Sequence, residues 1–258
     1  MSLENFSLDY FNLTGKVAIV TGGNTGLGQG YAVALAKAGA DVFVVTHNDN
    51  WEETRALIEA TGRKVHFKQA DLTAKESIKQ LVEECVSVFG RIDVLVNNAG
   101  TIRRAPLLEY KEEDWNAVMD INLNAVYFLS QEVAKVMVKQ ESGKIINIGS
   151  MLSFQGGKFI PPYTASKHGV AGLTKAFANE LGQYNIQINA IAPGYIETAN
   201  TAPIRADEAR NAEILSRIPA GRWATPADLM GVIVFLASKA SDYMNGHILA
   251  VDGGWLAR

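Results

Sequence analysis

The sequence has few of the features that mark several large protein classes. It contains a single cysteine, Cys85, so no internal disulfide can form, which suits a reducing cytoplasm. Its 24 Lys and Arg residues against 27 Asp and Glu residues leave a net charge of −3, unlike the strongly basic surface of a nucleic-acid binder. No apolar run reaches the roughly 18 residues of a membrane span, and no basic start followed by an apolar block predicts a signal peptide. Because the four histidines are scattered, we also expect no metal site.

Short apolar segments alternate with segments of helical periodicity along almost the whole chain. Strands that are apolar throughout, each followed by a helix, indicate a parallel sheet covered on both faces. We therefore predict one α/β domain over residues 1–258, a doubly wound Rossmann-like sheet of seven parallel strands. Residues 195–222 interrupt the alternation and are predicted to cover a substrate site, with a short helix over Ala206–Ile218. The expected strands are Lys16–Val20, Asp41–Val45, Val65–Gln69, Ile92–Val96, Lys144–Ile148, Ile186–Ile191 and His247–Val251; the longest expected helix is Asp114–Lys139.

A glycine-rich loop follows the first expected strand. Gly22, Gly26 and Gly28 have the spacing G-x3-G-x-G, which departs from the G-x-G-x-x-G dinucleotide fingerprint because Tyr31 stands at its last position. Glycine allows a tight turn and close approach to a pyrophosphate, whose charge is favoured at the start of the next helix. A plain strand-to-helix turn is the alternative, but the place of the loop after the first strand favours dinucleotide binding.

The end of the second strand bears on the choice between NAD and NADP. Thr46 stands where a carboxylate would bind the adenosine ribose of NAD. No Lys or Arg stands at Thr25 or in the four residues after Thr46 to receive a 2′-phosphate. We predict NAD, with NADP possible through Thr46 and His47. Asp71, after the third strand, is placed to accept a hydrogen bond from the adenine amino group or to cap the helix that begins near Thr73.

Tyr163 and Lys167 carry the strongest chemical signal. Their i, i+4 spacing places them on one face of a helix. A free tyrosine has a pKa near 10. To act as a base at neutral pH, its phenolate form must be favoured over the phenol by about 3–4 kcal/mol more than in water. A lysine ammonium one turn away, close to a cationic nicotinamide ring, is a source of that preference. Ser150 ends the preceding strand, where its hydroxyl can hold a carbonyl oxygen; otherwise it caps a turn and Tyr163 is a half-buried helix residue.

In order and spacing, these residues resemble the short-chain dehydrogenase/reductase superfamily. The resemblance extends from Lys16 to Gly254, essentially the whole chain. It implies a Rossmann-type fold and hydride transfer between NAD(P) and an alcohol or ketone. The matching motifs are Thr21–Gly28, Asn97–Gly100, Asn122, Ser150, Tyr163-x-x-x-Lys167 and Pro193-Gly194.

The resemblance implies a role for each matching residue. Tyr163 would be the proton donor and acceptor, and Lys167 would hold the nicotinamide ribose and lower the pKa of the tyrosine. Ser150 would orient the reacting oxygen, and Asn122 would hold a water in a proton relay. The residues implied in cofactor binding are Gly22, Asn24, Thr25, Gly26, Leu27, Gly28, Thr46, His47, Asp71, Leu72, Asn98, Ala99, Gly100, Tyr163, Lys167, Pro193, Gly194, Ile196 and Thr198.

Stretches outside these motifs resemble the bacterial 2-dehydro-3-deoxy-D-gluconate 5-dehydrogenases, also called 2-deoxy-D-gluconate 3-dehydrogenases. This implies an NAD-dependent reaction at a secondary alcohol or ketone of a six-carbon sugar acid, in uronate breakdown. Arg103 and Arg104 follow the fourth strand, and Arg can grip a carboxylate through two hydrogen bonds. Gln155, close after Ser150, and Arg205, in the predicted lid, are further candidates; each is equally compatible with a solvated residue or an oligomer contact. The resembling stretches are Gly100–Arg104, Ser150–Gly157, Arg205–Glu208, Ile218–Trp223 and Gly253–Arg258.

Other interpretations of these motifs lead to different partners. A 3-oxoacyl-[acyl-carrier-protein] reductase has nearly the same motifs, but we would then expect basic residues at Thr25 and Thr46. A gluconate 5-dehydrogenase is a second enzymatic alternative. A non-catalytic nucleotide sensor would be expected to lack Ser150, Tyr163 or Lys167, and all three are present. The resemblance also implies a homotetramer that pairs the expected helices Asp114–Lys139 and Tyr163–Leu181, and the single cysteine favours a cytoplasmic location.

Overall fold

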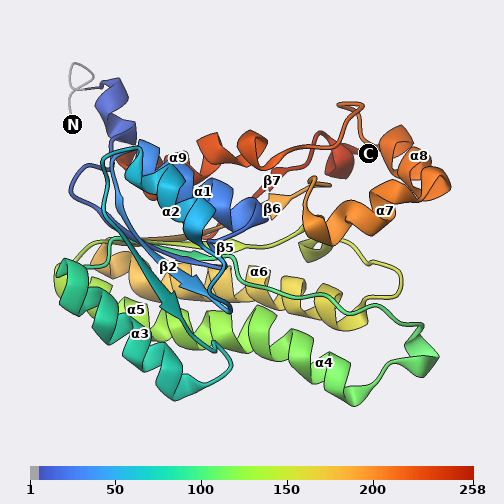
Figure 1. Ribbon diagram of the computed structural model, residues 1–258, viewed down its shortest axis with the longest axis horizontal. Coiled ribbons are helices and arrows are strands. Elements are labelled where there is room, and N and C mark those ends of the chain that lie inside the picture. The colour runs from blue at the N-terminus through green and yellow to red at the C-terminus, as the bar shows by residue number, and fades with distance from the viewer. Residues whose placement is uncertain (1–5) are drawn as a thin grey trace.

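A computed structural model describes residues 6–258, which form one seven-stranded parallel sheet covered by helices on both faces (Figure 1). The strand order is β3-β2-β1-β4-β5-β6-β7, so the direction of winding reverses between β1 and β4. Ligands in open parallel sheets bind outside the carboxyl ends of the strands at such a reversal. The predicted fold class is confirmed. The strands are β1 (Val17–Thr21), β2 (Asp41–Thr46), β3 (Val65–Gln69), β4 (Val94–Asn97), β5 (Gly143–Ile148), β6 (Ile186–Pro193) and β7 (Ile248–Val251).

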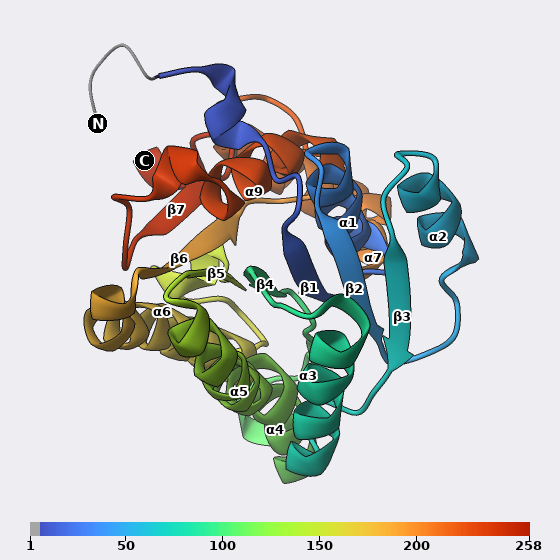
Figure 2. The same ribbon diagram turned by 90° about the vertical axis from the view of Figure 1, so that its left-hand side faces the viewer.

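Two groups of helices pack on opposite faces of the sheet (Figure 2). Successive strand side chains point to opposite faces, so Val20 and Val44 enter one core while Ile19 and Phe43 enter the other. All four side chains are fully buried. The first core is covered by α1 (Gly26–Lys37), α2 (Glu52–Glu59) and α9 (Met230–Ala237), and the second by α3 (Lys75–Phe89), α5 (Ala125–Gln140) and α6 (Pro161–Leu181).

The predicted single helix over Asp114–Lys139 is interrupted. Helix α4 (Glu112–Met119) passes into a π-helical turn at Asp120–Asn124 before α5 begins. A π-turn adds one residue to a helical turn and has no sequence signal of its own, so the sequence predicted one continuous helix. Such turns are frequent at functional sites, and this one contains the buried residue Asn122.

Residues 195–222 leave the sheet after β6 and lie beyond the carboxyl ends of the strands (Figure 1). They hold two helices, α7 (Ala202–Ala206) and α8 (Glu208–Arg217), where the sequence predicted one over Ala206–Ile218. Asp207 separates them because it is extended and its carboxylate accepts the Arg210 backbone N–H, capping α8. Within residues 6–258, no helix is both long and apolar enough to cross a membrane.

Candidate active site

The loop after β1 forms a closely packed turn at the start of α1. A Cβ atom on Gly28 would lie 2.0 Å from the carbonyl oxygen of Gly22, so only glycine fits there. The Asn98 side chain donates to the carbonyl of Thr21 at 2.9 Å, and the Thr21 hydroxyl accepts the backbone N–H groups of Asn98 and Ala99. The β1 and β4 loops are thus locked together around a helix N-terminus. This arrangement fits the pyrophosphate of a dinucleotide.

Thr46 ends β2 with its side chain turned inward. It is buried, and its hydroxyl donates to the Asn48 carbonyl at 2.6 Å. The Asn24 side chain of the glycine loop donates to the Asn48 side chain and to the Asn50 carbonyl. The turn after β2 is therefore fixed against the glycine loop, and no carboxylate stands at the end of the strand.

Asp71 caps the turn before α3. One of its carboxylate oxygens accepts the Thr73 backbone N–H at 2.9 Å and the Thr73 hydroxyl at 2.7 Å. These hydrogen bonds and, to a smaller extent, the nearby His47 hold the pKa of Asp71 below its usual range. The capping role weighed from the sequence is present, and the second carboxylate oxygen has no hydrogen-bond partner in the described part of the chain. Its contact with adenine stays a prediction.

The start of the lid lies against the glycine loop. A Cβ on Gly26 would lie 3.6 Å from a methyl carbon of Thr198, although the two residues are far apart in sequence. A Cβ on Gly194 would lie 2.6 Å from the Asp252 Cα, so glycine is required where β6 meets the end of β7. Ile196 is buried and pairs with Ala224. The other residues predicted to bind the cofactor, Thr25, Leu27, Leu72, Gly100 and Pro193, lie at or just after the carboxyl ends of β1, β3, β4 and β6.

Three side chains of the predicted chemical site meet where β5 and α6 adjoin. Lys167 Nζ lies 5.5 Å from the centroid of the Tyr163 ring and donates to the Ile148 carbonyl at 2.6 Å. Ser150 follows β5 and caps a short turn. The Ser153 hydroxyl accepts the Ser150 backbone N–H and donates to the Lys167 carbonyl at 2.9 Å. The Ser153 side chain, which lies in neither β5 nor α6, therefore connects the end of the strand to the helix.

Burial dominates the electrostatics of this cluster. Burial raises the pKa of Tyr163, while a hydrogen bond with Ser150 and the charge of Arg104 act in the opposite direction. Burial also lowers the pKa of Lys167 to about 8. The predicted effect of Lys167 on the pKa of the tyrosine, which also involves the nicotinamide ring, stays a prediction. In the protein alone, Ser150 and Arg104 are the groups that oppose the effect of burial on the Tyr163 pKa.

Asn122 uses its side chain to hold the loop after β4. Its Oδ1 accepts the Thr101 backbone N–H at 2.8 Å, and its Nδ2 donates to the Thr101 carbonyl at 2.9 Å and to the Ser166 hydroxyl at 3.3 Å. All of the side chain's polar atoms are therefore engaged within the protein. Its predicted part in a water relay stays a prediction.

Two of the predicted substrate arginines have acidic partners. Arg103 Nε lies 3.5 Å from an Asp114 carboxylate oxygen, and Arg103 also donates to the Thr101 hydroxyl. Arg205 Nη1 lies 3.7 Å from a Glu197 carboxylate oxygen. These partners partly neutralise both guanidinium groups.

Arg104 differs from both. Its side chain is exposed and makes no hydrogen bond or ion pair with any of residues 6–258, yet its charge is felt at the Tyr163 phenol. Gln155 also has no side-chain hydrogen bond in the same part of the chain, and its backbone N–H donates to the Met151 carbonyl. Among residues 6–258, the Arg104 guanidinium in the loop after β4 and the Gln155 amide in the loop beyond Ser150 thus have no side-chain partner.

Comparison with known proteins identifies the family. A family model described as enoyl-(acyl carrier protein) reductase matches residues 22–256. Proteins named 2-dehydro-3-deoxy-D-gluconate 5-dehydrogenase from Escherichia coli strain K12 and Bacillus subtilis strain 168 are each 56% identical to this chain. The matches cover 97% of the chain and 99% and 98% of those proteins. The chain belongs to the short-chain dehydrogenase/reductase family.

A solved relative gives the same result for the fold. The crystal structure of a gluconate 5-dehydrogenase from Burkholderia cenocepacia J2315, in complex with NADP and tartrate, has a TM-score of 0.94 and 38% identity. It matches over 98% of this chain and 100% of that one. As a member of this family, the enzyme is an NAD(P)-dependent oxidoreductase acting on CH–OH groups.

Three hydroxyl residues of the dehydrogenase site were not found from the sequence. Thr21 joins the β1 and β4 loops, Ser153 joins Ser150 to α6, and Ser166 contacts Asn122. Only Ser153 has a sequence signal, because a serine three residues after another serine is compatible with a reciprocal cap. The other two act through contacts that depend on the tertiary structure.

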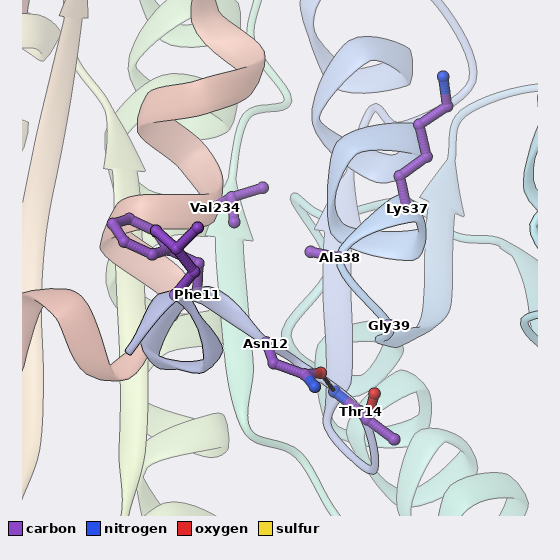
Figure 3. Close-up of a pocket in the computed structure, with 8 residues that line it drawn as sticks. Phe11, Asn12, Thr14, Lys37, Ala38, Gly39 and Val234 are labelled. Atoms are coloured by element: carbon purple, nitrogen blue, oxygen red, sulfur yellow. Dashed lines mark hydrogen bonds between the residues drawn. The ribbon is translucent and has the colours of Figure 1, made fainter. Parts of the chain in front are cut away.

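A pocket elsewhere on the enzyme lies at the far end of α1 (Figure 3). Since α1 has 12 residues, that end is about 18 Å from the glycine loop. Lys37 is the only titratable side chain of its lining. The pocket lining residues are Leu8, Phe11, Asn12, Thr14, Lys37, Ala38, Gly39 and Val234.

Within residues 6–258, no group of three or more His, Cys, Asp or Glu side chains is arranged to hold a metal ion.

Proposed function

We propose that the enzyme interconverts a secondary alcohol and a ketone on a six-carbon sugar acid, as a dehydrogenase of the 2-dehydro-3-deoxy-D-gluconate 5-dehydrogenase type. The observation that carries this proposal is the unpaired guanidinium of Arg104, in the loop after β4 that is hydrogen-bonded through Ala105 to Phe159, four residues before Tyr163. A sugar acid presents a carboxylate and a reacting carbon in one small molecule, so it matches a cation and an acid/base group set close together. The names of the two 56% identical relatives support the same substrate class.

The proposed chemistry uses Tyr163 as the acid/base. When bound, the nicotinamide ring accepts or supplies the hydride. In the oxidation, Tyr163 takes the hydroxyl proton as the carbon–hydrogen bond breaks; in the reduction, it returns that proton to the carbonyl oxygen. The Ser150 hydroxyl orients the reacting oxygen. Lys167, with a pKa lowered to about 8 by burial, stands one turn away to hold the ribose and to share the proton.

For the cofactor we propose a preference for NAD with NADP also accepted. No lysine or arginine stands at Thr25 or directly after Thr46 to attract a 2′-phosphate, which favours NAD. No carboxylate stands at the end of β2 to repel the phosphate either, and the exposed His47 is free to face it. The Burkholderia relative with bound NADP agrees with this tolerance. The measurement is kcat/KM for the two cofactors with one saturating substrate.

A substrate screen tests the proposed activity. Sugar acids with a hydroxyl or keto group at carbon 5 and acetoacetyl thioesters would be assayed with NAD(H) and NADP(H). We expect turnover of 2-dehydro-3-deoxy-D-gluconate to exceed that of gluconate and of the thioester. Faster turnover of the thioester would replace the proposal with an acyl-carrier-protein reductase, and faster turnover of gluconate would replace it with a gluconate 5-dehydrogenase.

The carboxylate contact is tested with a matched pair of arginines. Loss of a charge-assisted hydrogen bond of about 1.5–3 kcal/mol predicts that Arg104→Gln raises the KM of the sugar acid about 10- to 100-fold. The methyl ester of the same acid should be affected much less, because it has no charge. Arg103→Gln is the control, since Arg103 is already paired with Asp114. Equal KM changes for the acid and its ester would rule out Arg104 as the carboxylate ligand.

We also propose a cytoplasmic homotetramer. Helices α5 and α6 present Tyr127, which is exposed, and Gly172, whose Cβ position has no atom within 4 Å. These features leave room for a second copy of the helix pair. Light scattering should give four times the chain mass, and a stable monomer would contradict the proposal.

A further inference from the structure

Phe159 has a backbone conformation that is rare for a bulky residue. Its φ is +66°, in the left-handed region, where an L-residue other than glycine costs about 1–2 kcal/mol. The residue is 59% exposed, so burial of its side chain does not hold the backbone there. Such conformations persist where the surrounding structure fixes them, and they cluster at active sites.

The left-handed turn directs the Phe159 carbonyl toward the loop after β4. That carbonyl accepts the Ala105 backbone N–H at 3.1 Å, one residue after Arg104. On the other side of Arg104, the Arg103 carbonyl accepts the Tyr110 hydroxyl at 2.8 Å. The backbone on both sides of Arg104 is therefore anchored while the Arg104 side chain stays unpaired.

The same residue is joined to α6 by a stiff connection. Pro161 and Pro162 occupy the first positions of the helix, where their fixed φ suits helical geometry. Tyr163 follows directly. Between Phe159 and Tyr163 the chain therefore has little freedom, so a hydrogen bond at Phe159 links the loop that carries Arg104 to the helix that carries the phenol.

We propose that Phe159 is a positioning residue, and that its left-handed backbone, rather than its ring, sets the distance between Arg104 and Tyr163. In the proposed reaction this distance fixes the substrate carboxylate relative to the reacting carbon. The inference rests on the proposed function, because it gives Arg104 the carboxylate as its ligand.

A substitution series at Phe159 separates the backbone from the ring. Glycine and asparagine tolerate the left-handed region, whereas β-branched valine does not. We expect Phe159→Gly and Phe159→Asn to keep the KM of the sugar acid within about threefold, and Phe159→Val to raise it about tenfold, the size of one misplaced charged hydrogen bond. The Kd of NADH should stay unchanged in all three. An equal rise of KM in all three, or no rise in Phe159→Val, would overturn the proposal.

Two controls keep the result interpretable. Glu141 also has a positive φ of 52° but lies next to the amino end of β5, away from the site, so Glu141→Val should lower the melting temperature without changing KM. If Phe159→Val fails to fold, Phe159→Ala is the substitute, with a smaller rise of KM. Thermal melts and NADH binding establish folding.

A double-mutant cycle distinguishes this inference from the proposed function. In an Arg104→Gln background, Phe159→Val should add almost nothing to KM, because the positioned group is already absent. If Arg104→Gln alone leaves KM unchanged, the proposed function of Arg104 fails. If Arg104→Gln raises KM and Phe159→Val does not, only the role of Phe159 fails.

Discussion

The proposed cofactor side and the proposed substrate side of the candidate active site are built in different ways. On the cofactor side, the polar groups of Thr21 and Asn98 are hydrogen-bonded within the protein, and Gly28 packs so closely against the Gly22 carbonyl that no side chain fits between them. On the substrate side, Arg104 has no partner among residues 6–258, and Trp255 Nε1 and Arg205 Nε are buried without a hydrogen bond there. Folding alone satisfies these groups of the first side, although the buried Tyr31 hydroxyl of α1 also lacks a hydrogen-bond partner among residues 6–258. The second side keeps hydrogen-bond donors that have no partner in the protein and that a substrate can satisfy. Such groups are expected where residues bind a substrate instead of stabilising the fold.

The largest expected effect comes from the phenol between the two sides. Tyr163→Phe removes the proposed acid/base and should lower kcat about 10²- to 10⁴-fold, the usual contribution of such a group. Because the ring is kept, the Kd of NADH should change little. Stopped-flow hydride transfer and fluorescence titration with NADH measure the two quantities. Wild-type turnover by Tyr163→Phe would remove the residue from the mechanism.

A substitution on the cofactor side should affect binding instead of chemistry. Gly28→Ala places a methyl group 2.0 Å from the Gly22 carbonyl oxygen, so the loop has to move. We expect NADH affinity to fall at least about 100-fold, equal to about 2.7 kcal/mol. Gly231→Ala is the control, since a Cβ there has no atom within 4 Å. Near-normal affinity in Gly28→Ala would show that the cofactor side is less rigid than its contacts indicate.

The same division explains what could be predicted from the sequence. The parallel sheet could be predicted from the apolar patterning, and the glycine loop from its local spacing. Helical geometry was enough to predict that Tyr163 and Lys167 share one face of a helix. The left-handed backbone of Phe159 could not be foreseen, because phenylalanine has no preference for it and its carbonyl accepts the backbone N–H of Ala105, which is distant in sequence. The π-turn around Asn122 was also missed, because it interrupts a segment that is helical on both sides. The sign of the Tyr163 pKa shift depends on burial, which spacing does not report.

A substitution of Lys167 tests whether this buried lysine lowers the free energy of unfolding. Its pKa falls from 10.5 to about 8, so below pH 8 the native state holds a buried charge that the unfolded chain solvates better. Between pH 8 and 10.5 the unfolded state binds more protons than the native state, so the destabilisation caused by the buried charge diminishes as the pH rises. Lys167→Met should therefore abolish most turnover yet stabilise the fold at pH 7, by at most about 3 kcal/mol. Chemical denaturation at pH 7 and pH 10 measures the gain, which should shrink at the higher pH; a lasting loss of stability at both would contradict it.

The smallest effect is expected where the C-terminal segment meets the lid. The Arg217 guanidinium of α8 lies 3.9 Å from the centroid of the buried Trp255 ring, which also contacts Tyr195 just after β6. A cation–π contact of about 0.5–1 kcal/mol predicts a two- to fivefold rise in substrate KM for Arg217→Gln, because α8 loses one of its attachments. The Kd of NADH should not change, since the contact is on the substrate side. Arg210→Gln is the control on the same helix, where the arginine side chain is paired with Glu213. If Arg217→Gln weakened NADH binding as much as it raised KM, the two sides of the site would not be independent, and the lid would have to be regarded as part of both.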